Sequence, residues 1–424
     1  MRIPVLLISL SLLAGLTAGL TGENPACKQI RLETAKIWFD KGLSEQGAGL
    51  VNEAIVSYSR AIKINDQYAS AYNNRGNAYS EQNLCRLALS DYNKAIEIKP
   101  DGPDAYNNRG TVWECLGEKA RAIQDYSKAI ELNPKCAAFL ENRAGLLVSI
   151  LNPIAAIKDC RRALSLEPKS AKASSSLALA YYQLEDYQRA IEAYTTALRS
   201  NPTDSVSLSN RAAAYQMLNQ ESAALRDLTE SIRLCSSRPQ AFRLRGKIFN
   251  KLEKYDLAVI DLTWAIALDP HYPEAYMERQ NSRAHLGDYL GACDDSQRAM
   301  ELRPFDPFLV TDTGVRTLQL AAKQKSVPLY KKALSYFDCA IKMDKHCSYA
   351  LFFRGITRLE LGKFSDAIND LNLSIKLSNY HGAYAKRGMA KLKLGDKNGA
   401  KLDFLEAVKL NPSNKLATAE LKEL

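Results

Sequence analysis

The six-residue segment AYNNRG occurs twice in this chain, at Ala71–Gly76 and again at Ala105–Gly110, thirty-four residues later. The similarity extends beyond it, because AYNNRGNAYSEQNLCRLALSDYNKAIEIKP aligns with AYNNRGTVWECLGEKARAIQDYSKAIELNP without a gap. Self-similarity at a fixed period of this size is typical of a repeat architecture, in which copies of one unit stack on each other. The repetition therefore overrides the two or three globular domains that 424 residues would otherwise suggest.

An alanine marks each copy of the unit. It recurs in seven steps of 34 residues and then in steps of 41, 34 and 33, which gives eleven units between about residue 31 and residue 412. The marker alanines are Ala54, Ala88, Ala122, Ala156, Ala190, Ala224, Ala258, Ala292, Ala333, Ala367 and Ala400.

Each unit has the pattern of two helices. A second small residue follows each marker by seven positions, and a larger apolar residue such as Tyr58, Tyr92 or Tyr126 often follows it by four. These spacings place the side chains on one face of a helix. A glycine or alanine lies twelve residues before most markers, as at Gly76 and Gly110, and lets two backbones pack closely, while a proline closes seven units. One hairpin cannot bury its own apolar face, so neighbouring hairpins must stack into a solenoid.

This 34-residue hairpin with its Gly/Ala–Tyr–Ala–Pro pattern resembles the tetratricopeptide repeat (TPR) over about nine-tenths of the chain. The resemblance implies an all-α fold, a right-handed superhelical solenoid of antiparallel helix hairpins. We expect repeats 1–8 at residues 31–304, a ninth repeat with an insertion at 305–346, repeats 10 and 11 at 347–412 and a capping helix at 413–424.

Two units depart from the pattern. In the eighth, Gln280 replaces the small residue of the first helix, so we expect relaxed packing there. The ninth carries seven extra residues around Ala322–Lys332. Ser326 and Pro328 can begin its second helix, which leaves either a longer first helix or a basic protruding loop.

Arginine and aspartate vary together among the repeats. Eight units carry an arginine in the first helix and an aspartate sixteen residues later, as in Arg75 with Asp91 and Arg109 with Asp125. The first, fifth and ninth units lack both. The joint loss predicts a structural ion pair inside each hairpin, since the planar guanidinium can hold a carboxylate with two bonds. A row of ligand-binding arginines is the alternative.

The residue before that arginine has no packing partner in the pattern, and several units have asparagine there. The resulting row resembles the asparagine ladder of the O-GlcNAc transferase superhelix, which implies that amides one repeat apart grip a peptide backbone. An amide has both a donor and an acceptor, so it can pair with backbone of any sequence. The alternative is a polar residue tolerated on a solvated face. The candidate peptide-binding asparagines are Asn74, Asn77, Asn108, Asn142 and Asn210.

The carboxylate clamp, another groove of the TPR family that reads chaperone C-termini, is poorly matched. Asn77 and Asn108 fit it, but Asn73, Ala138 and Asn142 stand where the clamp has cations.

Farther along the chain, first-helix positions become apolar. Exposed aromatic side chains there would form a partner site, whereas burial against the lengthened ninth unit is the alternative. The residues are Phe308, Val315, Tyr349, Phe352, Phe353 and Ile356.

The N-terminus resembles a secretory signal peptide. Residues 1–22 have one arginine, an apolar run over 3–20 and small residues at candidate cleavage sites. We expect export and cleavage, to the periplasm or the exterior, or to the lumen of the endoplasmic reticulum. The alternative is an uncleaved anchor formed by residues 3–20. No later stretch is long and apolar enough to predict an integral membrane span.

The sequence favours a binding protein over an enzyme. Four scattered histidines form no metal spacing, nine cysteines form no disulfide framework, and no phosphate-binding or nucleophile motif occurs. We expect no cofactor or metal. The net charge of +10 is spread thinly, which does not favour nucleic acid. Two functions remain: a non-enzymatic scaffold that holds extended peptides or protein partners in its groove, and a co-chaperone of the secretory route or periplasm that binds unfolded apolar segments. The oligomeric state stays open.

Overall fold

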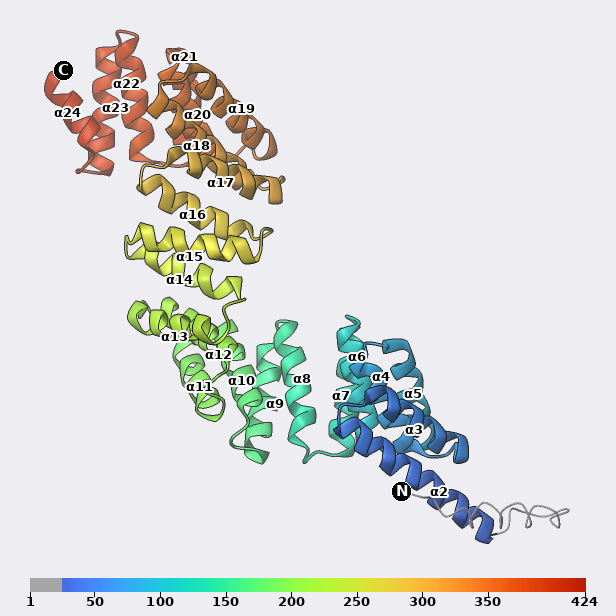
Figure 1. Ribbon diagram of the computed structural model, residues 1–424. Helices are drawn as coiled ribbons and strands as arrows, with labels where there is room; N and C mark the ends of the chain where they lie inside the picture. Colours follow the sequence, from blue (N-terminus) through green and yellow to red (C-terminus); the bar gives the residue numbers. More distant parts are fainter. Residues whose placement is uncertain (1–24) are drawn as a thin grey trace. The chain divides into compact units, whose positions relative to one another are not determined.

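The computed structural model describes residues 25–424, and the predicted signal peptide lies outside them. The described chain is a succession of helices joined by short turns, without a strand (Figure 1). The all-α solenoid predicted from the repeat is therefore confirmed. The chain divides into two compact units, one up to Ala214 and the other from Tyr215 to Leu424.

In the first unit, successive helices pair as antiparallel hairpins, and each hairpin packs on the next. The helices are α2 (Pro25–Gly47), α3 (Val51–Ile64), α4 (Ala69–Glu81), α5 (Cys85–Ile98), α6 (Pro103–Cys115), α7 (Lys119–Leu132), α8 (Ala137–Ser149), α9 (Pro153–Leu166), α10 (Ala171–Gln183), α11 (Tyr187–Ser200) and α12 (Ser205–Met217), within which the boundary falls.

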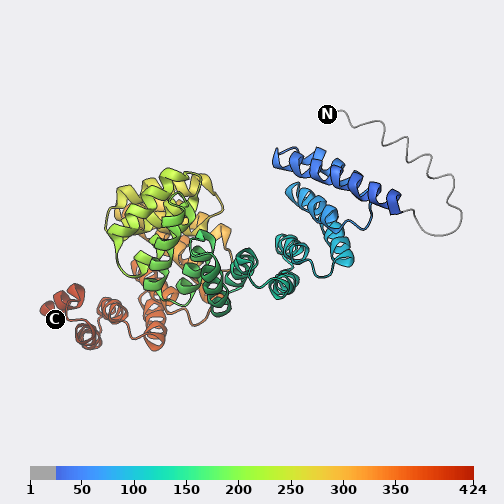
Figure 2. The ribbon, with the colours of Figure 1, turned by 90° about the horizontal axis from the view of Figure 1, so that it is seen from below.

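The second unit continues the same pattern and ends with a single unpaired helix, α24. Seen from below, its last helices appear end-on as a row (Figure 2). The helices are α13 (Glu221–Leu234), α14 (Pro239–Lys251), α15 (Tyr255–Leu268), α16 (Pro273–His285), α17 (Tyr289–Leu302), α18 (Pro307–Gln324), α19 (Val327–Met343), α20 (Ser348–Glu360), α21 (Phe364–Leu377), α22 (His381–Lys393), α23 (Lys397–Leu410) and α24 (Lys415–Glu423).

Small residues allow the two helices of a hairpin to touch. The marker alanines are fully buried, and a Cβ added at Gly76 would lie 2.7 Å from the ring of Tyr92. The same close approach recurs between Gly110 and Tyr126. The glycines are therefore required by packing, because an added methyl group has no room unless the ring moves.

The turn inside each hairpin needs one residue in the left-handed region. Glycine, which adopts this conformation without strain, occupies five of these eleven turns, and asparagine two. Leucine, glutamate or lysine stands in the others, where a side chain opposes the conformation. The residues are Gly49, Asn83, Gly117, Leu151, Glu185, Asn219, Glu253, Gly287, Lys325, Gly362 and Gly395.

The two irregular repeats keep the hairpin by local adjustments. The extra residues of the ninth lengthen both of its helices to 18 and 17 residues, so the longer-helix alternative holds and no loop protrudes. In the eighth, Gln280 is only 2% exposed and its amide donates to Asp312. Ser296 stands sixteen residues later, where most other repeats have an aromatic residue or a leucine. A large residue on one helix is thus matched by a small one on the other.

Candidate functional site

The recurring first-helix arginines form ion pairs with aspartates of the same hairpin. Seven of the eight Arg–Asp pairs lie within one unit, and in each the guanidinium donates through Nε and Nη2 to the two carboxylate oxygens at 2.6–3.0 Å. The eighth, Arg211 with Asp227, involves residues of different units and stays a prediction. The aspartates are buried, so the arginine supplies the charge compensation that burial of a carboxylate requires.

Each arginine also reaches the preceding repeat, which sequence reasoning missed. Nη1 of Arg109 donates to Asn93 at 2.7 Å, and Nη1 of Arg75 donates to Ser59 at 3.0 Å. The acceptor lies two residues after the preceding repeat's Arg–Asp position and is Ser, Asn, Thr or Asp wherever the next repeat has the arginine. Where the next repeat lacks it, Arg161 and Gln297 stand there instead. This covariation between successive repeats is the sequence pattern that could have predicted the contact.

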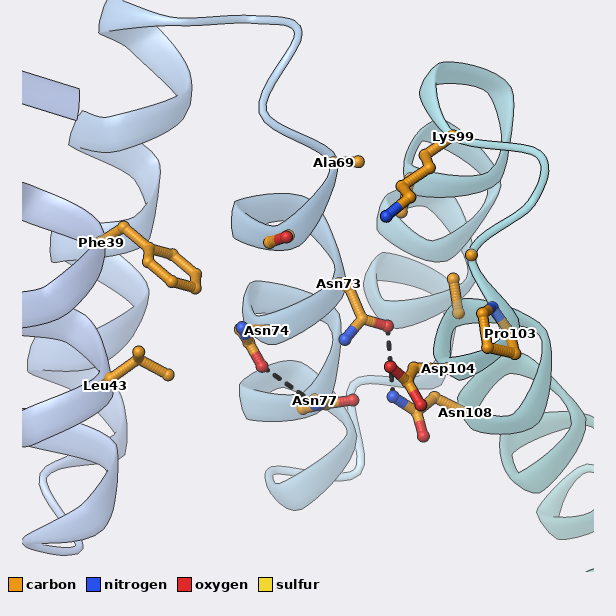
Figure 3. Close-up of a pocket in the computed structure, with 14 residues that line it drawn as sticks. Phe39, Leu43, Ala69, Asn73, Asn74, Asn77, Lys99, Pro103, Asp104 and Asn108 are labelled. Carbon is orange, nitrogen blue, oxygen red and sulfur yellow. Dashed lines mark hydrogen bonds between the residues drawn. The ribbon is translucent and has the colours of Figure 1, made fainter. Parts of the chain in front are cut away.

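A groove lies between the first helices of repeats 1 to 3. Phe39 and Leu43 of α2 form one wall and face Asn74 on α4, whereas the side chain of Asn73 on the same helix points toward Asn108 of α6 (Figure 3). Its volume is about 480 Å³. We call it the polar groove; it is lined by Phe39, Leu43, Ala69, Ser70, Asn73, Asn74, Asn77, Ala95, Lys99, Gly102, Pro103, Asp104, Ala105 and Asn108.

The asparagines of the polar groove bond to each other but keep free donors. Asn108 Nδ2 donates to Asn73 Oδ1 at 3.1 Å, and Asn77 Nδ2 donates to Asn74 Oδ1 at 3.4 Å. Asn77 Oδ1 accepts from the hydroxyl of Tyr92 at 2.8 Å. Within residues 25–424, the Nδ2 groups of Asn73 and Asn74 donate to no protein atom. The groove therefore presents amide donors beside an apolar wall.

The predicted asparagine row is not one continuous surface. Asn142 Nδ2 donates to Asn107 at 2.8 Å and its Oδ1 accepts from Lys172 at 2.6 Å, so both ends of that amide are occupied. Asn210, on α12, is half-buried and does not line the polar groove. The structure thus brings Asn74, Asn77 and Asn108 together and leaves Asn142 and Asn210 apart from them.

A second groove in repeat 10 has the opposite character. Tyr349, Phe352 and Phe353 of α20 and Tyr380, which precedes α22, surround a cavity of about 420 Å³. Phe352 meets Tyr380 edge to face with ring centroids 5.3 Å apart. Burial, followed by the nearby Asp312 carboxylate, raises the pKa of Tyr349. We call this the aromatic groove; it is lined by Ser348, Tyr349, Phe352, Phe353, Ser374, Ser378 and Tyr380.

The predicted apolar site residues do not all belong to the aromatic groove alone. Phe353 packs partly into a core cluster with Val315 and Phe337, as the burial alternative anticipated. Phe308, on α18, is 56% exposed and lies outside the aromatic groove.

The two grooves occupy the same place in the repeat. Each lies between the first helix of one hairpin, the end of its second helix and the start of the next first helix. Counted from the first-helix arginines Arg75 and Arg354, six of the seven lining positions of the aromatic groove have a counterpart that lines the polar groove. Ser70, Asn73, Asn74, Ala95 and Lys99 of the polar groove correspond to Tyr349, Phe352, Phe353, Ser374 and Ser378 of the aromatic groove.

The described part of the chain has no group of three His, Cys, Asp or Glu side chains placed to hold a metal ion. No helix among residues 25–424 is long and apolar enough to cross a membrane.

Family models match the repeat in five segments. A model described as TPR repeat matches residues 48–83, and models described as Tetratricopeptide repeat match 69–101, 103–136, 171–204 and 381–414. Together with the stacked hairpins, these matches show that the chain contains tetratricopeptide repeats and folds as a TPR solenoid.

Characterised relatives match over short stretches. Heat shock protein STI1 of Saccharomyces cerevisiae is 34% identical over 97 residues, which are 22% of this chain and 16% of STI1. DnaJ homolog subfamily C member 3 of Gallus gallus is 32% identical over 99 residues, 23% of this chain and 20% of the relative. The chain thus spans a fifth or less of the length of these relatives.

Solved structures with a similar arrangement of helices have low sequence identity. The Cut9–Hcn1 hetero-tetramer of the APC/C gives a TM-score of 0.49 at 15% identity over 98% of both chains. A tetratricopeptide repeat protein from Parabacteroides merdae gives 0.47 at 20% identity over 59% of this chain and 99% of that one.

Proposed function

We propose that this protein is a non-enzymatic interaction scaffold that holds an extended peptide, or an extended segment of a protein partner, in the polar groove. The observation that carries the proposal is the pair of free amide donors, Asn73 Nδ2 and Asn74 Nδ2, beside the apolar wall of Phe39 and Leu43. Backbone carbonyls of any peptide accept from such donors, and an apolar peptide side chain covers the wall.

The existing bonds among the asparagines favour this use. Asn108 and Asn77 hold Asn73 and Asn74 through their oxygens, so the amide groups are oriented before a ligand arrives. A preorganised donor loses less conformational freedom on binding than a free surface side chain. Lys99 and Asp104 at the far side of the groove add one charge of each sign. The groove therefore suits a peptide of mixed sequence.

The experiment is site-specific photocrosslinking. A benzoylphenylalanine at position 43 faces the polar groove, whereas one at position 87, an exposed leucine on α5, serves as the control. We expect partner adducts from position 43 that disappear in Asn73→Ala/Asn74→Ala. The matched control is Asn142→Ala, whose amide is already occupied outside this groove. Adducts of equal yield in the double variant and the wild type would reject the polar groove as the site.

Export is a separate part of the proposal. The N-terminal residues have the pattern of a signal peptide, and we propose that the mature protein works in the periplasm, outside the cell or in the lumen of the endoplasmic reticulum. N-terminal sequencing of the native protein tests cleavage, which we expect near residue 22. An intact Met1 on protein recovered from membranes would favour the anchor instead.

The aromatic groove favours a second candidate, a co-chaperone that binds unfolded apolar segments. Two of the relatives matched over short stretches are named as a heat shock protein and a DnaJ homologue, which agrees with such a role. Light scattering by a chemically denatured client distinguishes the candidates. A co-chaperone suppresses aggregation in proportion to its concentration and loses the effect in Phe352→Ala, whereas a dedicated scaffold leaves aggregation unchanged.

A further inference from the structure

We infer that the aromatic groove binds an acidic segment of another protein that carries one large apolar side chain. The inference extends the proposed scaffold function to a second groove with its own ligand chemistry. The polar groove recognises backbone, whereas this groove would select for side chains.

The rings of the aromatic groove are arranged to receive another ring. Tyr349 and Phe352 each meet Phe353 edge to face, at centroid distances of 4.7 and 5.0 Å, and Phe352 meets Tyr380 in the same way. Aromatic side chains prefer such edge-to-face and offset contacts, so an inserted ring gains directional contacts besides area. A cavity of about 420 Å³ accepts one such side chain.

The rings are not explained by packing alone. Phe353 joins the core, but Tyr349 and Tyr380 remain 46% and 45% exposed. The equivalent place in repeat 2 is filled by serine and asparagine, and that hairpin forms with the same helix lengths. The repeat therefore does not need aromatic residues there, and an exposed cluster of rings is characteristic of an interaction site.

The charge around the aromatic groove is positive. Residues 305–424 contain 20 Lys and Arg against 12 Asp and Glu, an excess of 8, whereas residues 1–304 have 37 against 35, an excess of 2. Most of the net charge thus belongs to the last three repeats and the terminal helix, so the expectation that it is spread thinly along the whole chain was wrong. A cationic surface attracts acidic partners and steers their approach.

An unpaired charge close to the groove is also cationic. Lys386 lies on α22, at the position that Asn108 has in the polar groove, and has no ion-pair partner among the described residues. The acidic groups nearby are engaged: Asp370 by Arg354 and Arg358, and Asp312 by Arg316. Glu360 and Asp366 lie at the opposite ends of α20 and α21 from the lining residues.

These charges also indicate which molecule fills the groove. A second copy of the chain brings the same excess of positive charge at this groove, so like charges oppose its docking there. The ligand is therefore a segment of another protein, in which Asp or Glu flanks the apolar anchor.

The test measures binding of three short fluorescent peptides to the full chain by polarisation. In the first, one phenylalanine is flanked by two glutamates on each side; in the second, alanine replaces the phenylalanine; in the third, lysines replace the glutamates. We expect the first to bind at least about tenfold more tightly than either other peptide, with an affinity that falls as salt is raised. Equal binding of the glutamate and lysine peptides would overturn the acidic preference and leave a general apolar site. No binding of the first peptide would overturn the proposal.

Variants locate the site. Phe352→Ala and Lys386→Glu should each weaken the first peptide by about tenfold or more, and Phe352→Leu retains an apolar side chain if the alanine variant fails to fold. Phe308→Ala, an exposed ring outside the groove, is the matched control and should not change binding. Asn73→Ala/Asn74→Ala should also leave this peptide bound, so failure of the polar groove and failure of the aromatic groove give different results. A dimer in sedimentation that Phe352→Ala abolishes would assign the groove to a second copy and reject the inference.

Discussion

Replacing Arg109 by alanine should destabilise the third repeat and its junction with the second. Arg109 Nε and Nη2 donate to Asp125 at 2.8 and 2.7 Å, and Nη1 donates to Asn93 at 2.7 Å. Removal of one partner of a fully buried ion pair costs about 3–5 kcal/mol, because the other charge stays buried and uncompensated. The side chains of Arg109 and Asp125 are 21% and 9% exposed, so we expect about 2–4 kcal/mol for Arg109→Ala.

The double-mutant cycle separates the pair from its surroundings. Asp125→Ala should cost about 1–3 kcal/mol, since Arg109 keeps some solvent and its bond to Asn93. The double variant should lose little more than Arg109→Ala alone, which gives a coupling of about 1–3 kcal/mol. Native-state hydrogen exchange measures the opening of each helix separately, which suits a repeat array. We expect lower protection in α6 and α7 for both single variants, and in α5 chiefly for Arg109→Ala.

The matched control is Lys128→Ala. Lys128 lies on the same helix as Asp125 and forms an exposed ion pair with Glu131 at 3.0 Å, so its loss should change stability by no more than about 0.5 kcal/mol. Fully additive losses in the double variant would refute the pairing of Arg109 with Asp125. Unchanged protection of α5 in Arg109→Ala would refute the bridge to the preceding repeat.

Four further predictions concern single positions. In urea unfolding, Gly76→Ala should destabilise the chain by about 1–3 kcal/mol, since its methyl group meets a buried ring, whereas Gly145→Ala, with open space around it, should stabilise by about 0.5–1 kcal/mol. Leu151→Gly should stabilise by about 0.5–1 kcal/mol, because Leu151 is exposed at a φ of 59°. Burial raises the pKa of Cys160 to about 12, so iodoacetamide at pH 8 should modify this thiol only after denaturation; its modification in the native protein would contradict the burial. Burial raises the pKa of Asp312, so folding binds a proton there and stability falls as the pH rises above 3.8 through the raised value. The melting temperature of Asp312→Asn relative to wild type should therefore fall as the pH is lowered through that range, and a constant difference would refute it.

Much of the fold follows from the repeated pattern. The alanines at fixed spacing and the glycine opposite a tyrosine predict the hairpin, because close helix packing leaves no room for larger side chains. The joint presence of Arg109 and Asp125, and the joint absence of their counterparts in the fifth repeat, indicate a contact from the sequence alone. Comparison among internal copies supplied this information without homologues.

The finer contacts could not be predicted in this way. The bond from Arg109 to Asn93 crosses between repeats, and only an alignment of each repeat against the following one makes that relation visible. Relaxed packing was expected at Gln280 because its compensation, a serine on the facing helix, is an exchange of side-chain volume between two positions. The hydrogen bond from Asn108 to Asn73 depends on side-chain geometry that no spacing rule specifies.

The residue just before the recurring first-helix arginine varies among the repeats, whereas the arginine itself does not. It is Asn74, Asn108 and Asn142 in the early repeats, but Leu244, Glu278, Phe353 and Lys386 later, while the arginine beside it is kept in eight units. Because amide, acid, ring and cation are all tolerated there by hairpins of the same fold, packing does not dictate the residue type at this position. Asn74, Asn108 and Phe353 of this row line one of the two grooves. A substitution of Asn74 should therefore alter ligand binding with little change in stability, and a substitution of the neighbouring Arg75 should do the reverse.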